Sequence, residues 1–315
     1  MISVEMYQSE KAPEWDEFVS QSKNGSFLFF RKYMDYHQTR FKDASLLFRN
    51  QKKIIAVLPA NVVETIVYSH QGLTFGSLLL SKKIQASQVL EIVDLMKNHY
   101  SGLGYTQLYY KKIPAYFSIY PAEEDLYALF RSDVQLYRRD LSSVIDLSSA
   151  LPFSETKRQN VAKCLAENFE IKEITALEDY WEILELALEK FDAKPVHSLS
   201  EIKYLRDLFA ENIRFFGVYK KDSLLAGTVI YDFGTVAHTQ YMATNDEGRK
   251  AGALDFLIHH LVTEVFSSRR FFSFGISTNN EGKVLNDGLL LQKEMFGARA
   301  IVLDHYKLDL IGKSR

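Results

Sequence analysis

LLAGTVIYDFGTVAHTQYMATNDEGRKAGALDFLIHHLVTEV, at Leu224–Val265, is the stretch whose pattern predicts the architecture of the chain. Alternating apolar residues and a tight turn predict two antiparallel strands, and a helical apolar period follows a polar segment that contains glycines. The expected elements are a strand at Leu225–Tyr231, a turn at Asp232–Gly234, a strand at Val236–Met242, a loop at Ala243–Gly252 and a helix from Ala251 to Phe266.

The loop at the start of this helix predicts an anion site. The first amides of a helix have no acceptor within the helix, and the helix dipole places partial positive charge there. Arg249 and Lys250 would add full charges, and Gly248 and Gly252 would let a phosphate approach the backbone because they lack a Cβ atom. The alternative is a solvated turn that simply leads into a helix.

The totals describe a folded protein with no strong global charge. A length of 315 residues predicts two domains, and the formal net charge of −2 gives no basic field that would attract nucleic acid or an anionic membrane. The single cysteine, Cys164, lies in a helical pattern and is expected to be a core thiol in a reducing compartment. Without a signal peptide or an apolar run of membrane-spanning length, we expect a cytoplasmic protein with no membrane span.

The two halves of the chain repeat one order of elements. Both are predicted to run β-α-α-β-β-β-α-β-α-β, and a helix at Ser154–Glu167 links them. This repetition predicts a duplicated α/β unit with a mixed sheet, one domain at residues 1–146 and the other at residues 147–315.

This order of elements resembles that of the GNAT acyltransferases, and the doubled unit resembles the Fem-like peptidyl- and acyltransferases. Weak local patterns follow one another along the chain in the order of that family, and each is similar to one of its segments. These are Trp15–Phe18 with Asn24–Gly25, Ile54–Pro59 with Ser69–Gly76, Arg158 with Ala162 and Asn168–Phe169, Ser273–Ser277, and Gly288–Gly297.

The resemblance implies a donor site for acyl-CoA, such as acetyl-CoA, in the second half. GNAT enzymes bind the CoA pyrophosphate on a loop of the pattern (Q/R)-x-x-G-x-(G/A), onto which Arg249, Gly252 and Leu254 fall. Leu254 departs from the pattern, and a shift of one residue would bring Ala253 into its place. The expected cofactor-binding residues are Gly248, Arg249, Lys250, Ala251, Gly252 and Ala253. The first half offers Ser69–Gly76 at the equivalent place without cations, so we expect it to be a scaffold or to bind the acceptor.

Two candidate catalytic residues lie on the strand Val236–Met242. Strict alternation would put His238 and Gln240 on one face and Thr239 and Tyr241 on the other. His238 could accept a proton from the attacking amine, and Tyr241, beside the predicted anion loop, could line the substrate cleft. The alternatives are a core histidine with a hydrogen-bond partner and a tyrosine that only packs.

Lys293 is the third candidate. It lies at the edge of the apolar stripe that Leu285, Leu289 and Phe296 would form on a helix at Val284–Phe296. An edge lysine can reach solvent, or it can turn into a cleft and stabilise a phosphate or an oxyanion. The matching lysine of the Fem-like helix has a phosphate-side role, so the resemblance favours the second interpretation.

The sequence leaves three functions open. The first is transfer of an acyl group from acyl-CoA to a small-molecule or peptide amine. The second is aminoacyl-tRNA-dependent transfer to a cell-wall peptide, which the resemblance supports. The third is a non-catalytic protein that has kept the fold. No metal site is expected, because His259 and His260 are adjacent on a helix and point about 100° apart.

Overall fold

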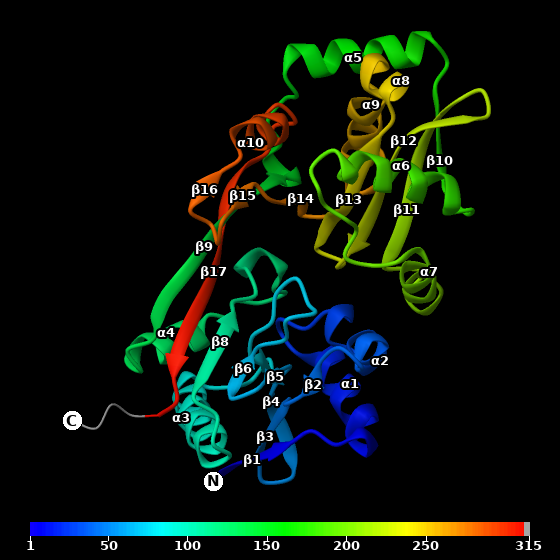
Figure 1. Ribbon diagram of the computed structural model, residues 1–315. Helices are drawn as coiled ribbons and strands as arrows, with labels where there is room; N and C mark the ends of the chain where they lie inside the picture. The colour runs from blue at the N-terminus through cyan, green and yellow to red at the C-terminus, as the bar shows by residue number, and fades with distance from the viewer. Residues whose placement is uncertain (312–315) are drawn as a thin grey trace. The chain divides into compact units, whose positions relative to one another are not determined.

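The computed structural model describes residues 1–311, and they form two compact units (Figure 1). Unit 1 contains Met1–Asp140, Glu281–Lys283 and the chain from Val302, whereas unit 2 contains Leu141–Asn280 and Val284–Ile301. The predicted boundary at residue 146 therefore falls near the point where the chain leaves unit 1. The C-terminal strand, however, returns to unit 1, so neither unit is one continuous segment.

Unit 1 contains two sheets. One has the strand order β1-β3-β4-β7 and is antiparallel, and the strands β8, β6, β5 and β2 follow one another in the second, where β6 and β8 are parallel. The elements are β1 (Ile2–Met6), α1 (Ala12–Gln21), α2 (Arg31–Met34), β2 (Lys42–Asp43), β3 (Leu46–Asn50), β4 (Lys53–Leu58), β5 (Asn61–Val63), β6 (Ile66–Tyr68), β7 (Leu79–Leu80), α3 (Ala86–Gly102), β8 (Gln107–Lys111), α4 (Glu124–Arg131) and the first part of β9 (Gln135–Asp146).

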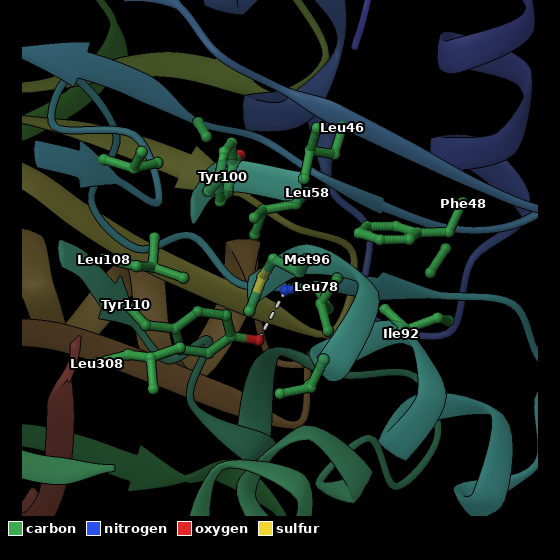
Figure 2. Close-up of a cluster of buried hydrophobic side chains, with 14 of the residues drawn as sticks. Leu46, Phe48, Leu58, Leu78, Ile92, Met96, Tyr100, Leu108, Tyr110 and Leu308 are labelled. Carbon is green, nitrogen blue, oxygen red and sulfur yellow. Dashed lines mark hydrogen bonds between the residues drawn. The ribbon is translucent and has the colours of Figure 1, made fainter. Parts of the chain in front are cut away.

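The core of unit 1 forms because α3 carries a buried stripe at helical spacing. Ile92, Met96 and Tyr100 lie on that stripe and pack against Leu108 and other strand residues (Figure 2). The polar atoms in this core have partners, since the Tyr100 hydroxyl donates to the Ala44 carbonyl at 2.7 Å. Leu308 and Leu310 from the end of the chain are buried in the same cluster, which is why the last strand belongs to unit 1.

Unit 2 contains a sheet with the strand order β10-β11-β12-β13-β14-β9. Its elements are the second part of β9, α5 (Glu155–Ala166), β10 (Glu170–Glu173), α6 (Glu178–Glu189), α7 (Leu199–Leu208), β11 (Ile213–Lys220), β12 (Ser223–Asp232), β13 (Val236–Thr244), α8 (Asp246–Ala251), α9 (Ala253–His260), β14 (Phe271–Ile276), β15 (Thr278–Asn279), β16 (Val284–Leu285), α10 (Asp287–Glu294) and the start of β17 (Arg299–Asp309). Residues of α5 and α9 pack on one side of this sheet, as in the cluster of Cys164, Ala253, Leu257, Phe272 and Phe296.

Several elements differ from what the sequence pattern predicts. Residues 62–68 form two strands, β5 and β6, because Glu64 turns the chain with a φ of +53°. The expected loop Ala243–Gly252 contains α8, which the Asn245 side chain caps by accepting from the Gly248 amide at 2.8 Å. The expected helix Val284–Phe296 begins only at Asp287, and Leu285 is exposed on β16.

No helix in the described part of the chain has both the length and the apolar character that a membrane span requires.

Candidate functional site

The candidate site lies where β13 and β14 stop pairing. These parallel strands pair only over Val236–His238 and Phe271–Ser273, although both continue further. A parallel pair that ends early leaves main-chain N–H and C=O groups at the facing strand edges outside the ladder. The side chains nearest to this separation are therefore the first place to look for chemistry.

A β-bulge in β13 changes which side chains share a face. Val229 pairs with Tyr241 and Ile230 pairs with Thr239, so Gln240 is the extra residue. Ala237 and Met242 both contact the core beside α9, although strict alternation would put them on opposite faces. The predicted alternation is therefore wrong beyond Gln240. His238 follows Ala237, and Tyr241 precedes Met242. Because side chains alternate between neighbouring residues, His238 and Tyr241 both lie on the face opposite those core residues.

His238 is held as a neutral imidazole at this separation. Its Nδ1 atom lies 3.0 Å from Ser273 Oγ, and only 8% of the residue is exposed. Burial, with a smaller effect from the nearby positive charge of Lys293, lowers the pKa of His238 to about 4. A histidine with this pKa is uncharged at neutral pH and is a weak proton acceptor.

Lys293 lies deeper than the predicted stripe implied. It is 2% exposed, and its ammonium donates to the carbonyls of Gly275 and Ile276 at 3.0 and 2.6 Å and to Ser277 Oγ at 2.9 Å. An ammonium has three N–H groups, so these contacts use all of them. Lys293 therefore secures the end of β14 and brings a buried charge close to His238. Burial lowers its pKa to about 8.

Tyr241 anchors a loop through its hydroxyl. The oxygen accepts from the amides of Val196 and His197 at 3.1 and 3.3 Å and lies 2.7 Å from His197 Nδ1. Because a phenol has one proton to donate and two lone pairs, the Tyr241 proton belongs on the bond to His197 Nδ1. Burial raises the pKa of Tyr241. The structure thus gives Tyr241 a loop-holding role beside α6, where its ring also meets Trp181 edge-on.

The two glycines of the predicted donor loop pack against protein. A Cβ atom on Gly248 would collide with the Leu225 carbonyl of β12, and one on Gly252 would lie 2.5 Å from the Asn160 Cβ of α5. Gly252 also ends α8 in the left-handed conformation with a φ of +78°. Helix packing and chain reversal therefore also account for these glycines, and close approach of a phosphate stays a prediction.

The first turn of α9 carries a carboxylate with partners from α5. Asp255 in its first turn accepts from Lys157 Nζ at 2.6 Å and from Asn160 Nδ2 at 2.7 Å. This internal carboxylate complements the helix dipole, as a bound anion would. Sequence reasoning missed this contact, although an acid in the first turn of a predicted helix was a usable signal.

The remaining residues of the loop differ in their exposure to solvent. Arg249 and Lys250 are exposed, and Arg249 lies 3.8 Å from Asp246. Ala253 is fully buried in the core, and the Ala251 carbonyl accepts from the thiol of Cys164, whose pKa burial raises to about 11. Of the six expected cofactor-binding residues, the two cations present their side chains to solvent.

The equivalent loop of unit 1 contacts a lysine that the sequence pattern did not show. Ser69 Oγ donates to the Gly76 carbonyl at 2.6 Å and accepts from the Lys111 amide at 2.7 Å. The Lys111 side chain, from β8, donates to the Leu73 carbonyl inside this loop. Burial lowers the pKa of Lys111 to about 7. The stretch Ser69–Gly76 itself has no lysine or arginine, as expected, but a lysine from a distant strand contacts it.

No protein-family model and no curated protein sequence matches the chain. Solved structures do match over nearly its whole length. FemX superposes with a TM-score of 0.69 at 10% identity and covers 98% of this chain and 97% of its own. L-PGS from Bacillus licheniformis superposes with a TM-score of 0.62 at 13% identity, with 98% and 94% covered. A tandem GNAT protein from the clavulanic acid biosynthesis pathway has a TM-score of 0.51 at 9% identity and full coverage of both chains.

At such low identities the similarity concerns the fold. The mixed α/β units and these superpositions confirm the predicted fold class, in which two GNAT-like domains occur in tandem. The protein has a GNAT-like, Fem-like fold.

Proposed function

We propose that the protein transfers an acyl group to an amine at the separation of β13 and β14 in unit 2. The observation that carries this proposal is the early end of the β13–β14 ladder, with His238, Ser273 and Lys293 around it. In this reaction the amine nitrogen bonds to the carbonyl carbon, and the carbon–sulfur or carbon–oxygen bond of the donor breaks. The amine loses a proton, and the leaving group takes one up.

The residues around the separation suit stabilisation of charge more than proton transfer. The positive charge of a buried ammonium stabilises a developing oxyanion nearby, because little solvent screens the interaction. This electrostatic effect does not require a direct hydrogen bond from the ammonium. Main-chain amides at the open edge of β13 supply hydrogen-bond donors. Since His238 is a weak base, the amine reacts after losing its proton to solvent.

The contacts around the beginning of α9 support a second candidate for the donor. Acyl-CoA is the donor that the loop pattern predicts, but Asn160 of α5 packs against Gly252 and donates to Asp255 in the first turn of α9. An aminoacyl ester of tRNA needs no pyrophosphate site. Arg249 and Lys250 remain available to phosphates of either donor.

A transfer assay with both donors tests the function and separates the candidates. Purified protein is incubated with acetyl-CoA or with aminoacylated tRNA and a panel of primary amines, and acylated amine is measured by mass spectrometry. We expect acylated amine with at least one donor. Replacement of Arg249 and Lys250 by uncharged residues should lower the amount formed with that donor. Absence of product from both donors with every amine in the panel would refute the transferase proposal.

The pH profile tests the assigned chemistry. The rate should lack an inflection near the usual histidine pKa of about 6.5 and should fall as Lys293 loses its charge above about pH 8. Lys293→Met should lower the rate and remove the falling limb. His260→Gln, on the α9 side of the sheet, is the control and should leave the profile unchanged. A wild-type rate in Lys293→Met would contradict the role of the buried charge.

A further inference from the structure

The loop Ser69–Gly76 of unit 1 packs on an aromatic cluster that contains two stacked histidines. The rings of His37 and His70 have centroids 5.4 Å apart and planes 17° apart, and the ring of Phe41 contacts both. Each histidine is only 3% exposed. Gly72 of the loop also packs here, since a Cβ atom built on it would lie 2.3 Å from His37 Nε2. The position of the loop therefore depends on how these two imidazoles stack.

His70 is held in this stack at a cost in stability. Its φ of +66° lies in the left-handed region, which residues with a Cβ atom seldom adopt. Its Nδ1 atom is buried, and no residue that the structure describes forms a hydrogen bond with it. A strained backbone and a buried polar atom without a partner persist only where the surrounding packing enforces them. His70 is therefore a point at which the loop can be released.

The surroundings of His70 oppose its protonated form. The titratable and charged side chains around it are His37, Lys111 from β8, and Arg31 from α2 with its carboxylate partners Asp35 and Asp43. Burial first, and then the positive charges of the three basic groups, hold the pKa of His70 well below its usual value of 6.5. The imidazole is therefore neutral at pH 7 while the loop is closed.

We infer that His37 and His70 form an acid-sensitive latch on the loop Ser69–Gly76. At neutral pH the uncharged rings stack and hold the loop closed. In acid, His70 takes up a proton when the loop opens and its ring meets water, because inside the stack the described residues offer Nδ1 no acceptor. Acid therefore shifts the loop towards the open form. Opening breaks the contact of Lys111 Nζ with the Leu73 carbonyl, so pH controls the exposure of this lysine.

Hydrogen exchange of the full chain between pH 7 and 4.5, read by mass spectrometry, tests the latch. The reporters are the amides of Gln71 and Leu73, which donate to Asn61 Oδ1 at 2.7 Å and to the His70 carbonyl at 3.3 Å. After correction for the intrinsic pH dependence of exchange, the opening constant of the loop should rise about tenfold for each pH unit below about 6.5, because the open loop binds one more proton. His70→Asn should remove this rise, since asparagine tolerates the left-handed conformation and does not titrate.

His99→Gln is the matched control, because His99 is a half-buried histidine of α3 in the same unit and burial lowers its pKa too. This variant should keep the wild-type rise. An opening constant that does not change with pH in the wild type, or a full rise in His70→Asn, would overturn the inference. Parallel loss of protection in the α3 amides would also overturn it, because acid would then unfold the whole unit. If His70→Asn does not fold, His70→Gly gives the same comparison, since glycine adopts a positive φ without strain.

Discussion

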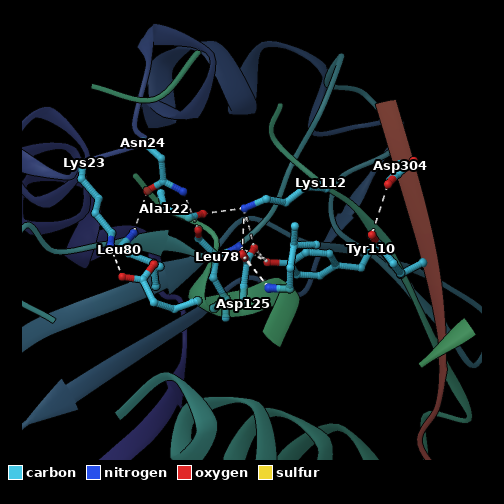
Figure 3. A network of polar contacts seen from close by, with 12 residues as sticks. Lys23, Asn24, Leu78, Leu80, Tyr110, Lys112, Ala122, Asp125 and Asp304 are labelled. Carbon is cyan, nitrogen blue, oxygen red and sulfur yellow. Dashed lines mark hydrogen bonds and ion pairs between the residues drawn. The ribbon is translucent and has the colours of Figure 1, made fainter. Parts of the chain in front are cut away.

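At the scale of single residues, buried lysines differ in their partners. Lys293 donates to two main-chain carbonyls and Lys111 to one, and burial lowers the pKa of each. Lys112 has a carboxylate partner instead. Its ammonium lies 2.7 Å from Asp125 Oδ1, and Tyr110 donates to the same carboxylate at 2.6 Å (Figure 3). A buried ammonium without a counter-charge costs stability, whereas a paired one depends on its partner.

The pKa of Lys293 predicts how stability changes with pH. Its folded value of about 8 lies below its ordinary value of 10.5, so the unfolded chain binds more protons between these pH values. Stability should therefore rise with pH across this window, by about 3 kcal/mol from this residue. Lys293→Met should show a smaller rise when denaturant unfolding is measured from pH 8 to 10.5. Parallel curves for the two proteins would contradict the assignment.

The Lys112–Asp125 pair predicts a large loss from a small change. Asp125→Asn leaves a buried ammonium without a counter-charge and should lower the free energy of unfolding by about 3–5 kcal/mol. Glu178→Gln breaks a surface pair with Lys203 and should cost less than about 1 kcal/mol. Urea unfolding measures both variants. Similar losses would show that burial does not distinguish the two pairs.

At the scale of elements, α8 and α9 show how packing around a motif depends on distant parts of the chain. The pattern of glycines and cations was visible in the sequence, but α5 comes from far along the chain and places Asn160 against Gly252. Likewise, the bulge at Gln240 decides that His238 and Tyr241 share a face, and single-strand periodicity does not reveal it. The sequence indicated the position of the α9 start. Tertiary contacts determined which side chains pack against it.

Two glycines with similar backbone angles test the contact between α5 and Gly252. Gly252 and Gly234 have φ values of +78° and +82°, but nothing lies within 4 Å of a Cβ atom built on Gly234. Gly234→Ala should cost only the left-handed strain, about 1–2 kcal/mol. Gly252→Ala should cost clearly more, because Asn160 must also move. Thermal unfolding compares the two variants, and an equal loss would mean that the contact with α5 is not tight.

At the scale of the whole molecule, the division of the chain into units is discontinuous. Residues of β17 from His305 to Asp309 pair with β8, and Leu308 joins the core around α3. The sequence repeat predicted a single cut near residue 146 and gave no sign of this return. A repeat in element order records which elements form each unit, but strand pairing decides which segment completes a sheet.

A fragment of residues 1–146 should therefore be unstable. It lacks the β17 neighbour of β8, so it exposes a strand edge and part of the α3 core. The same fragment with residues 299–311 fused through a flexible linker should recover cooperative unfolding. Circular dichroism on heating distinguishes the two. A cooperative transition in the fragment without β17 would show that unit 1 is complete before the chain returns.

The sequence alone indicated the succession of helices and strands and the duplicated α/β class, because these follow from periodicity and turn chemistry along neighbouring residues. It also indicated the strand on which His238 and Tyr241 lie. Only the tertiary structure decided that Lys293 donates its hydrogen bonds to the end of β14, that Asn160 of α5 donates to Asp255 at the start of α9, and that acidic residues of α6 line a groove. These features join residues far apart in the chain, and local pattern carries no information about which distant side chains meet.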